Sequence, residues 1–331
     1  MTENMKQMTK ESLRIIFMGT PEFAEESLKA LVEGGYNVGG VITMPDKAVG
    51  RGYKLQPSAV KQYALSKGLN VLQPTSLKDP HFLDELKALR ADLQIVVAFR
   101  MLPEVVWNMP PLGTFNLHAS LLPQYRGAAP INWALINGEQ ETGVTTFFLS
   151  HEIDTGRIIF SEKTSILDED NAGSLHDRLM AMGAKLVTKT VDAIVEGNVS
   201  TLSQSELVED NEVLKTAPKI FSETCRVNWD RTATEVCNLI RGLSPYPAAW
   251  TELTTNEGEE PYRFKLFAAE IVVEEHSLPT GTIRTDNKSH LEVAVANGFT
   301  RITELQMQGK KRMLTAVFLN GFSFPEDAIF S

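Results

Sequence analysis

The chain has 331 residues, 43% of them hydrophobic and 22% charged, and its formal net charge is −10. A chain of this length favours two domains over a single core, and its acidic balance argues against a protein that wraps nucleic acid indiscriminately. The composition is that of an ordinary globular protein. The sequence contains no run of about 18 apolar residues, so it predicts no membrane span.

The N-terminus, the cysteines and the histidines indicate the compartment and the metal content. The opening MTENMKQMTKES is polar and lacks the apolar centre of a signal peptide. Cys225 and Cys237 match neither a disulfide framework nor a metal-ligand spacing, and the histidines contain no HExxH pattern. We therefore expect a cytoplasmic protein with no membrane partner and no bound metal.

The first half of the chain alternates apolar runs with amphipathic segments, which predicts a parallel, doubly wound sheet. After the apolar run LRIIFMG at 13–19, we expect Thr20 to cap a helix, Pro21 to take its first position and Gly34 to end it. Further strands are expected at 36–44, 69–74, 92–99 and 113–118, and further helices between 57 and 69, near 79–90 and at 129–138. The turn GTPEF lacks GxGxxG, so it gives little support to dinucleotide binding.

The segment PDKAVGRGYKLQP, at 45–57, predicts a loop because it is rich in glycine, proline and charge. It opens the most basic part of the chain, which extends to residue 67. The cations there are Lys47, Arg51, Lys54, Lys61 and Lys67, and the only acid is Asp46, a local balance of +4. On charge alone, such a segment is usually a solvated face.

The second half of the chain changes character after a long helix expected at 172–196. Before that helix, a strand pair is expected at 143–150 and 156–166. After it, the polar residues 198–216 predict a linker. A helix at 232–241 and short strands at 263–273, 290–296 and 300–307 then predict a small all-β barrel. The expected fold is thus a Rossmann-like, mostly parallel α/β domain (1–197), a linker (198–216) and a smaller C-terminal all-β domain (217–331).

The clearest chemical signal lies at the end of the strand GTFNLH. Alternation along a strand places Asn116 and His118 on the same side, at the sheet edge where open parallel sheets bind ligands. An amide can stabilise an oxyanion, and an imidazole can exchange a proton near neutral pH. Asp154, in a glycine-flanked loop, supplies a carboxylate that could orient the histidine.

Each of these residues also has a structural interpretation. A polar strand end or a turn aspartate needs no function. Ser120 is a possible nucleophile, but it lacks the GxSxG elbow. His151 competes with His118 for the role of base, and spacing alone does not choose between them.

Taken together, these motifs resemble the folate-dependent formyltransferase family. FNLHASLLPQYRGAAPINWAL (115–135) and ETGVTTFFLSHEIDTGRII (141–159) carry the family's NxH, SLLPxYRG and DTG elements in its order and spacing. The opening RIIFMGTPEFA, the loop MPDKAVGRGYKLQPSAVK and the later APKI and IRGLSPYPAAW are similar to the members that formylate the methionine of the initiator tRNA. The resemblance covers nearly the whole chain.

The resemblance implies an enzyme whose N-terminal domain binds 10-formyltetrahydrofolate. The formyl group would pass to the α-amino group of methionine on the charged initiator tRNA, for translation initiation, by direct attack of the amine. Asn116, His118 and Asp154 match the family's catalytic trio. The folate-contacting turn corresponds to Ser120, Leu121, Leu122 and Pro123.

For the tRNA, the resemblance implies a role for the basic loop and for the C-terminal barrel. Arg51, between Gly50 and Gly52, matches a loop arginine that reaches the acceptor end, and we expect Lys47 and Lys54 to help clamp the phosphates. The barrel resembles an OB-fold that helps to hold the tRNA. We expect a monomer.

Two departures and two alternatives remain. Phe99-Arg100 stands where many relatives carry a tyrosine-glycine pair and a slightly longer segment bordering the folate pocket, and Ala119 replaces a glycine found in some. The alternatives are another folate-dependent formyltransferase acting on a sugar nucleotide or other small amine, and a non-catalytic RNA-binding protein. The last 115 or so residues argue against a purine-pathway enzyme, and the intact trio argues against a non-catalytic protein.

Overall fold

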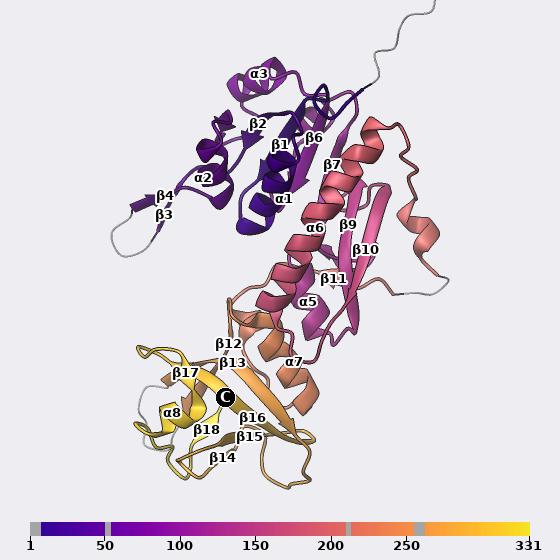
Figure 1. The fold of residues 1–331 in the computed structure, drawn as a ribbon. Helices are drawn as coiled ribbons and strands as arrows, with labels where there is room; N and C mark the ends of the chain where they lie inside the picture. The colour runs from indigo at the N-terminus through magenta and orange to yellow at the C-terminus, as the bar shows by residue number, and fades with distance from the viewer. Residues whose placement is uncertain (1–7, 50–53, 210–212, 255–261) are drawn as a thin grey trace, which may run out of the picture. The chain divides into compact units, whose positions relative to one another are not determined.

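The computed structural model describes residues 8–49, 54–209, 213–254 and 262–331 (Figure 1). Contacts within the chain divide it into two compact units. Unit 1 comprises Met1–Gly127, Gly143–Thr164 and His176–Lys215, and unit 2 comprises Ala128–Thr142, Ser165–Leu175 and Thr216–Ser331. The domain limits expected at 197 and 216 stay predictions.

The sheet of unit 1 has the strand order β10-β9-β7-β6-β1-β2-β5. Its strands are β1 (Ile15–Gly19), β2 (Val38–Ile42), β5 (Val71–Leu72), β6 (Leu93–Val97), β7 (Thr114–His118), β9 (Glu141–Phe148) and β10 (Ile158–Ser165). Parallel pairing joins β5, β2, β1, β6 and β7 in that order, and β9 runs antiparallel to β7. The expected mostly parallel sheet is confirmed.

Helices cover both faces of this sheet, as expected for a doubly wound fold. The helices of unit 1 are α1 (Glu22–Glu33), α2 (Ala59–Ser66), α3 (Pro80–Ala88), α4 (Glu104–Trp107) and most of α6 (Ala172–Val195), whereas α5 (Pro130–Ile136) belongs to unit 2. On one face, Ile16, Met18 and Val96 pack with residues of α3 and α4. On the other face, Leu117 of β7 lies against Gly183 of α6, where a Cβ atom would come within 2.6 Å of its side chain. Figure 1 shows α6 running along β7, β9 and β10.

Two local expectations are wrong. The residue that caps α1 is Pro21 rather than Thr20, and the Thr20 hydroxyl has no hydrogen-bond partner in the described part of the chain. The segment 45–57, expected to be a loop, contains the paired strands β3 (Lys47–Val49) and β4 (Lys54–Gln56). Their backbones hydrogen-bond to each other, so local composition did not reveal them.

The residues after α6 pack against the sheet of unit 1. Leu202 pairs its backbone with Ile158, and Arg157 donates to the hydroxyl and the carbonyl of Thr201. The short 3-10 helix η1 (Gln204–Leu207) follows, and Gln204 is only 3% exposed. This part of the predicted linker therefore belongs to the packed structure of unit 1.

Unit 2 contains an antiparallel sheet with the order β14-β15-β16-β13-β12-β18, and β17 pairs with β16. These strands are β12 (Ala249–Thr254), β13 (Tyr262–Val272), β14 (Ile283–Thr285), β15 (Leu291–Val295), β16 (Gly298–Met307), β17 (Met313–Leu314) and β18 (Ile329–Phe330). A bridge between Thr282 and Ile329 joins its two edges and nearly closes a barrel. The expected C-terminal all-β barrel is confirmed.

The interior of this barrel is apolar and rich in phenylalanine. Phe264 contacts the rings of Phe318, Phe322, Phe324 and Phe330. The amphipathic helix α7 (Ala233–Leu243) begins with a capping box between Thr232 and Glu235 and buries its apolar face in the same cluster. The short helices η2 (Glu223–Cys225) and α8 (Thr315–Leu319), and the short strands β8 (Arg126–Gly127) and β11 (Thr216–Ala217), complete the described elements.

Candidate active site

Asn116 and His118 lie at the carboxyl end of β7, on the face of the sheet opposite α6. The intervening Leu117 packs under α6, so alternation turns both polar side chains to the other face. His118 is 7% exposed, whereas Asn116 is partly exposed and its side-chain amide forms no hydrogen bond with the described part of the chain. An amide that is accessible and unpaired can donate to a bound group.

The two ring nitrogens of His118 have different partners. Nε2 lies 2.8 Å from the backbone carbonyl oxygen of Tyr125. A carbonyl oxygen only accepts, so Nε2 carries a proton and donates it. Nδ1 lies 4.0 Å from Oδ2 of Asp154. The neutral imidazole therefore holds its lone pair on Nδ1, on the side of the carboxylate, and a second proton there would face a negative charge.

Asp154 is held in an unusual conformation in the loop between β9 and β10. Its φ is +54°, in the left-handed region that non-glycine residues seldom adopt. Its Oδ2 accepts a 3.0 Å hydrogen bond from the backbone N–H of Gly127. At Gly156 the loop approaches β9 so closely that a Cβ atom would lie 1.6 Å from the carbonyl oxygen of Phe148. This loop thus places the Asp154 carboxylate beside His118.

The turn Ser120–Pro123 follows β7 directly, and its polar groups are occupied by the protein. The Ser120 hydroxyl is fully buried and donates to the carbonyl of Gln124 at 2.7 Å. Thr145 donates to the Ser120 carbonyl and accepts from the N–H of Leu122. Ser120 points its hydroxyl into this turn, which gives no support to a nucleophilic role. Leu122 and Pro123 are buried and Leu121 is half-buried.

His151, the competing base, does not join His118. Its side chain is 74% exposed and lies 3.7 Å from Glu104. Its ring packs edge-on against Trp107, with 5.4 Å between the ring centroids. Of the two histidines, only His118 has a buried position beside Asp154.

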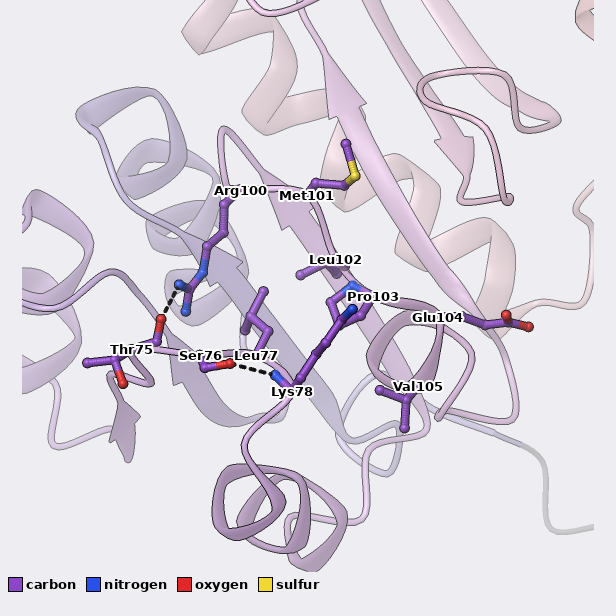
Figure 2. Close-up of a pocket in the computed structure, with 10 residues that line it drawn as sticks. All are labelled: Thr75, Ser76, Leu77, Lys78, Arg100, Met101, Leu102, Pro103, Glu104 and Val105. Carbon is purple, nitrogen blue, oxygen red and sulfur yellow. Dashed lines mark hydrogen bonds between the residues drawn. The ribbon is translucent and has the colours of Figure 1, made fainter.

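A cavity of about 910 Å³ opens beside the segment that follows β6 (Figure 2). It is lined by Thr75–Lys78 and Arg100–Val105. The lining segment Arg100–Val105 follows β6, and Asn116 and His118 lie at the end of β7. These are neighbouring parallel strands, in which Val96 pairs with Asn116. The carboxyl ends of both strands therefore meet at one edge of the sheet, where such folds bind ligands. The volume suits a small organic molecule.

Of the unusual pair Phe99-Arg100, Arg100 forms part of this cavity wall. Arg100 donates to the backbone carbonyls of Pro74 and Thr75 at 2.5 and 2.8 Å, and Figure 2 shows its side chain pointing toward Thr75. Burial lowers the pKa of the Arg100 guanidinium. Phe99 packs into the apolar cluster beneath the sheet face. The Arg100 side chain thus connects its own segment to the backbone of the segment that begins the other side of the cavity wall.

The basic segment contributes fewer free cations than its composition suggests. Lys61 pairs with Asp46 at 2.7 Å, and Lys67 lies 3.9 Å from Glu33. The hydrogen bonds from Lys61 and Gln73 lower the pKa of the Asp46 carboxyl. Lys47 is exposed on β3. Arg51 and the side chain of Lys54 lie outside the described residues.

Sequence reasoning missed three residues around the trio. The Tyr125 carbonyl sets the histidine tautomer, and Gln204 bonds both to Arg126 and to the loop of Asp154. The YRG part of the family motif contains Tyr125 and Arg126, but a backbone carbonyl leaves no signal in a side-chain pattern. Gln204 lies in the polar stretch that predicted a linker.

Among the residues that the structure describes, no group of three or more histidine, cysteine, aspartate or glutamate side chains is arranged to hold a metal ion. No helix within these described residues is both long and apolar enough to cross a membrane.

Comparisons with known proteins identify the family. Residues 13–191 match the model of the formyl transferase family, and residues 219–323 match the model of the formyl transferase C-terminal domain. The chain belongs to the formyl transferase family.

Two curated relatives and one solved structure refine the comparison. A methionyl-tRNA formyltransferase of Parabacteroides distasonis is 63% identical over 95% of this chain and 97% of its own length. Another, of Bacteroides thetaiotaomicron, is 59% identical over 95% and 97%. The crystal structure of an N-formyltransferase of Helicobacter canadensis, in complex with folinic acid and dTDP-3-aminofucose, superposes with a TM-score of 0.64. That protein is only 20% identical over 91% of this chain and all of its own, so it supports the fold alone.

Proposed function

We propose that this chain transfers the formyl group of 10-formyltetrahydrofolate to the α-amino group of methionine on the charged initiator tRNA. The observation that carries the proposal is the convergence of His118 and Asp154, with Asn116 on the same strand face. The high identity to two relatives named methionyl-tRNA formyltransferase, over nearly the full length of each, supports the choice of acceptor.

The chemistry required is the exchange of one C–N bond for another. The methionyl amine forms a bond to the formyl carbon, the bond from that carbon to the folate nitrogen breaks, and a proton passes from the amine to the folate nitrogen. Negative charge develops meanwhile on the formyl oxygen. The protein must stabilise that charge and carry the proton.

Asn116 suits the first task and His118 the second. The free amide of Asn116 can donate to the developing oxyanion, and one such donor typically contributes about 10²–10³ in rate. Nδ1 of His118 can take the amine proton, because Nε2 is committed to the Tyr125 carbonyl. The resulting imidazolium lies beside Asp154, whose charge stabilises it until the proton passes on. General acid–base help of this kind contributes roughly 10²–10⁴.

For the folate donor, the cavity beside Arg100–Val105 is the best-suited binding region. It lies at the sheet edge that carries Asn116. Lys78 supplies an exposed cation to its rim, which complements the carboxylates of folate. The turn Ser120–Pro123 would support this region from β7. Figure 2 shows the lining residues.

For the tRNA, we propose contacts from the β3–β4 segment and from the barrel of unit 2. Lys47 is exposed there, and Arg51 and Lys54 follow it in the sequence. Phosphate contacts would add affinity that falls with rising salt. Because charged initiator tRNA is used where proteins are synthesised, we further propose that the enzyme is cytoplasmic. We also propose that it acts as a monomer.

The test is a formylation assay with purified chain, 10-formyltetrahydrofolate and three acceptors. These are charged initiator methionine tRNA, charged elongator methionine tRNA and a dTDP-amino sugar. We expect formylation of the initiator tRNA at a kcat/KM far above that for the other two. Preferred use of the amino sugar would favour the sugar-nucleotide alternative, and no turnover with any acceptor would favour a non-catalytic RNA-binding protein.

A further inference from the structure

Gln204 joins the two loops that hold the histidine and the aspartate. We propose that Gln204 is a positioning residue, which acts through Arg126 and the Asp154 loop to hold the Asp154 carboxylate beside His118. The inference rests on the proposed function for its kinetic readout, because it assigns a further role in the same reaction.

All four hydrogen-bonding positions of the Gln204 amide are occupied. Nε2 donates to the carbonyl oxygens of Asp154 and Gly156, at 2.8 and 2.9 Å. Oε1 accepts from Nε and Nη2 of Arg126, at 3.0 and 2.6 Å. A flipped amide would set its oxygen against two carbonyls and its nitrogen against guanidinium donors. The orientation is therefore determined by its partners.

One side of this amide holds the strained residue of the active site. Asp154 has a φ of +54°, a conformation that costs free energy for a residue with a side chain. Such a conformation persists only when its surroundings impose it. The bond from Gln204 to the Asp154 carbonyl, the bond to the Gly156 carbonyl and the bond from Gly127 to the Asp154 carboxylate impose it from three directions.

The other side of the amide holds the loop that orients the histidine. Arg126 lies between Tyr125, whose carbonyl accepts from His118, and Gly127, whose N–H donates to Asp154. When Gln204 fixes the Arg126 guanidinium, it fixes the residue that separates those two contacts. Gln204 therefore links the Tyr125 carbonyl, which accepts from Nε2 of His118, to the Asp154 carboxylate. Oδ2 of that carboxylate lies 4.0 Å from Nδ1 of His118.

Gln204 does not itself suit a role in contact with substrate. It is 3% exposed, and its amide has no donor or acceptor left to offer. Its effect on the reaction must pass through Asp154 and His118. A positioning role can therefore be distinguished from a general stabilising role. Positioning matters only while residue 154 carries a carboxylate, whereas general stabilisation does not depend on that side chain.

The experiment is a double-mutant cycle with Gln204→Met, which keeps the volume and removes the four hydrogen bonds. It is made alone and with Asp154→Asn, and Ser205→Ala, at an exposed position in the same short helix, is the matched control. We expect Gln204→Met to lower kcat about 10–100-fold, as small misplacements of reacting groups do, with both KM values within threefold. In the Asp154→Asn background the same change should cost less than threefold, and Ser205→Ala should match the wild type.

Loss of the same size in both backgrounds, or an unchanged kcat, would overturn the proposal. If Gln204→Met does not unfold cooperatively, Gln204→Glu replaces it. The carboxylate still accepts from Arg126 but cannot donate to the two carbonyls, so kcat should fall by a similar factor, and an unchanged kcat is again decisive against the proposal.

A second readout does not depend on formyl transfer. Nitrogen NMR of histidine-labelled protein should show His118 as the Nε2–H tautomer in the wild type and a mixture of tautomers in the Gln204 variant. If the wild type does not formylate methionyl-tRNA, the proposed function fails, yet the NMR signals still test Gln204. Identical His118 signals in both proteins would refute the positioning role.

Discussion

Each unit of this chain contains a buried polar side chain held by arginine, and the two networks are built differently. In unit 1, Gln204 bonds Arg126 and two carbonyls of a loop in which Asp154 is strained. In unit 2, Glu292 of β15 accepts from Arg284 of β14 and Arg301 of β16. These three residues are direct cross-strand neighbours in a regular antiparallel sheet.

The difference lies in what each network leaves open. Arg284 also pairs with Glu274 and stacks on Phe299, so the charges around Glu292 are matched within the barrel. Around Asp154, the chain of contacts ends at Nδ1 of His118, which holds a lone pair, and the amide of Asn116, unpaired within the described part of the chain, lies on the same strand face as that histidine. The closed network around Glu292 stabilises the fold. The open network around Asp154 and His118 can bind and transfer a proton. Four groups of substitutions test this contrast, in order of expected effect.

The open network should lose activity but little stability when its end is removed. We expect His118→Ala to lower kcat about 10²–10⁴-fold, because the proton acceptor is lost, and Asn116→Ala to lower it about 10²–10³-fold. Formylation kinetics measure the first effect, and urea unfolding should show the free energy of unfolding nearly unchanged. A variant with near wild-type kcat would remove that residue from the catalytic assignment.

The Asp154 loop should be displaced if its close approach to β9 at Gly156 is blocked. In Gly156→Ala the new methyl group would meet the Phe148 carbonyl oxygen at 1.6 Å, so the Asp154 loop must move. We expect a loss of roughly 3 kcal/mol in the free energy of unfolding, together with lost activity, measured by urea denaturation and by formylation. Gly321→Ala is the control, because nothing lies within 4 Å of the added atom. Equal stability of the two variants would contradict the close packing of this loop.

The closed network should lose stability without a direct effect on chemistry. Glu292→Gln removes the buried carboxylate that Arg284 and Arg301 share, and we expect a loss of roughly 2–3 kcal/mol in the free energy of unfolding at pH 7. Burial alone raises the pKa of Glu292, but hydrogen bonds and charges from Arg301 and Arg284 together outweigh it, so the pKa lies below its ordinary value.

This depressed pKa gives the stability difference a definite dependence on pH. For a carboxyl with a lowered folded-state pKa, the stabilisation is complete above the unfolded pKa, about 4.3, and disappears as pH falls through the folded value. Wild type and Glu292→Gln should therefore converge in stability in acid. A constant difference between them from pH 7 down to pH 3 would show that the charge of Glu292 contributes nothing.

The smallest effect should come from a residue that belongs to neither network. Lys47→Ala removes one exposed cation, and we expect a two- to fivefold rise in KM for tRNA, an unchanged KM for folate and a shallower salt dependence of tRNA binding. We expect Arg51→Ala to act in the same direction and more strongly. Equal losses for tRNA and folate would indicate a structural role for the segment.

Much of the architecture was predictable because it depends on short-range pattern. Continuous apolar runs marked β1 and β6, and alternation along β7 placed Asn116 and His118 together. The β3–β4 pairing was not predictable from composition, since each strand is short and gains its hydrogen bonds only from the other. The polar stretch containing Gln204 looked like a linker for the same reason: its buried contacts are with residues about 50 and 78 positions away.

By itself, the sequence determined the class of fold, the strand that carries the asparagine and histidine, and the family to which the chain belongs. Tertiary structure alone decided which nitrogen of His118 is free, how Asp154 is held beside it, and why His151 is excluded. The physical reason is that apolar periodicity is a local property of the chain. The state of a buried imidazole depends instead on a backbone carbonyl and a carboxylate that only folding brings to it.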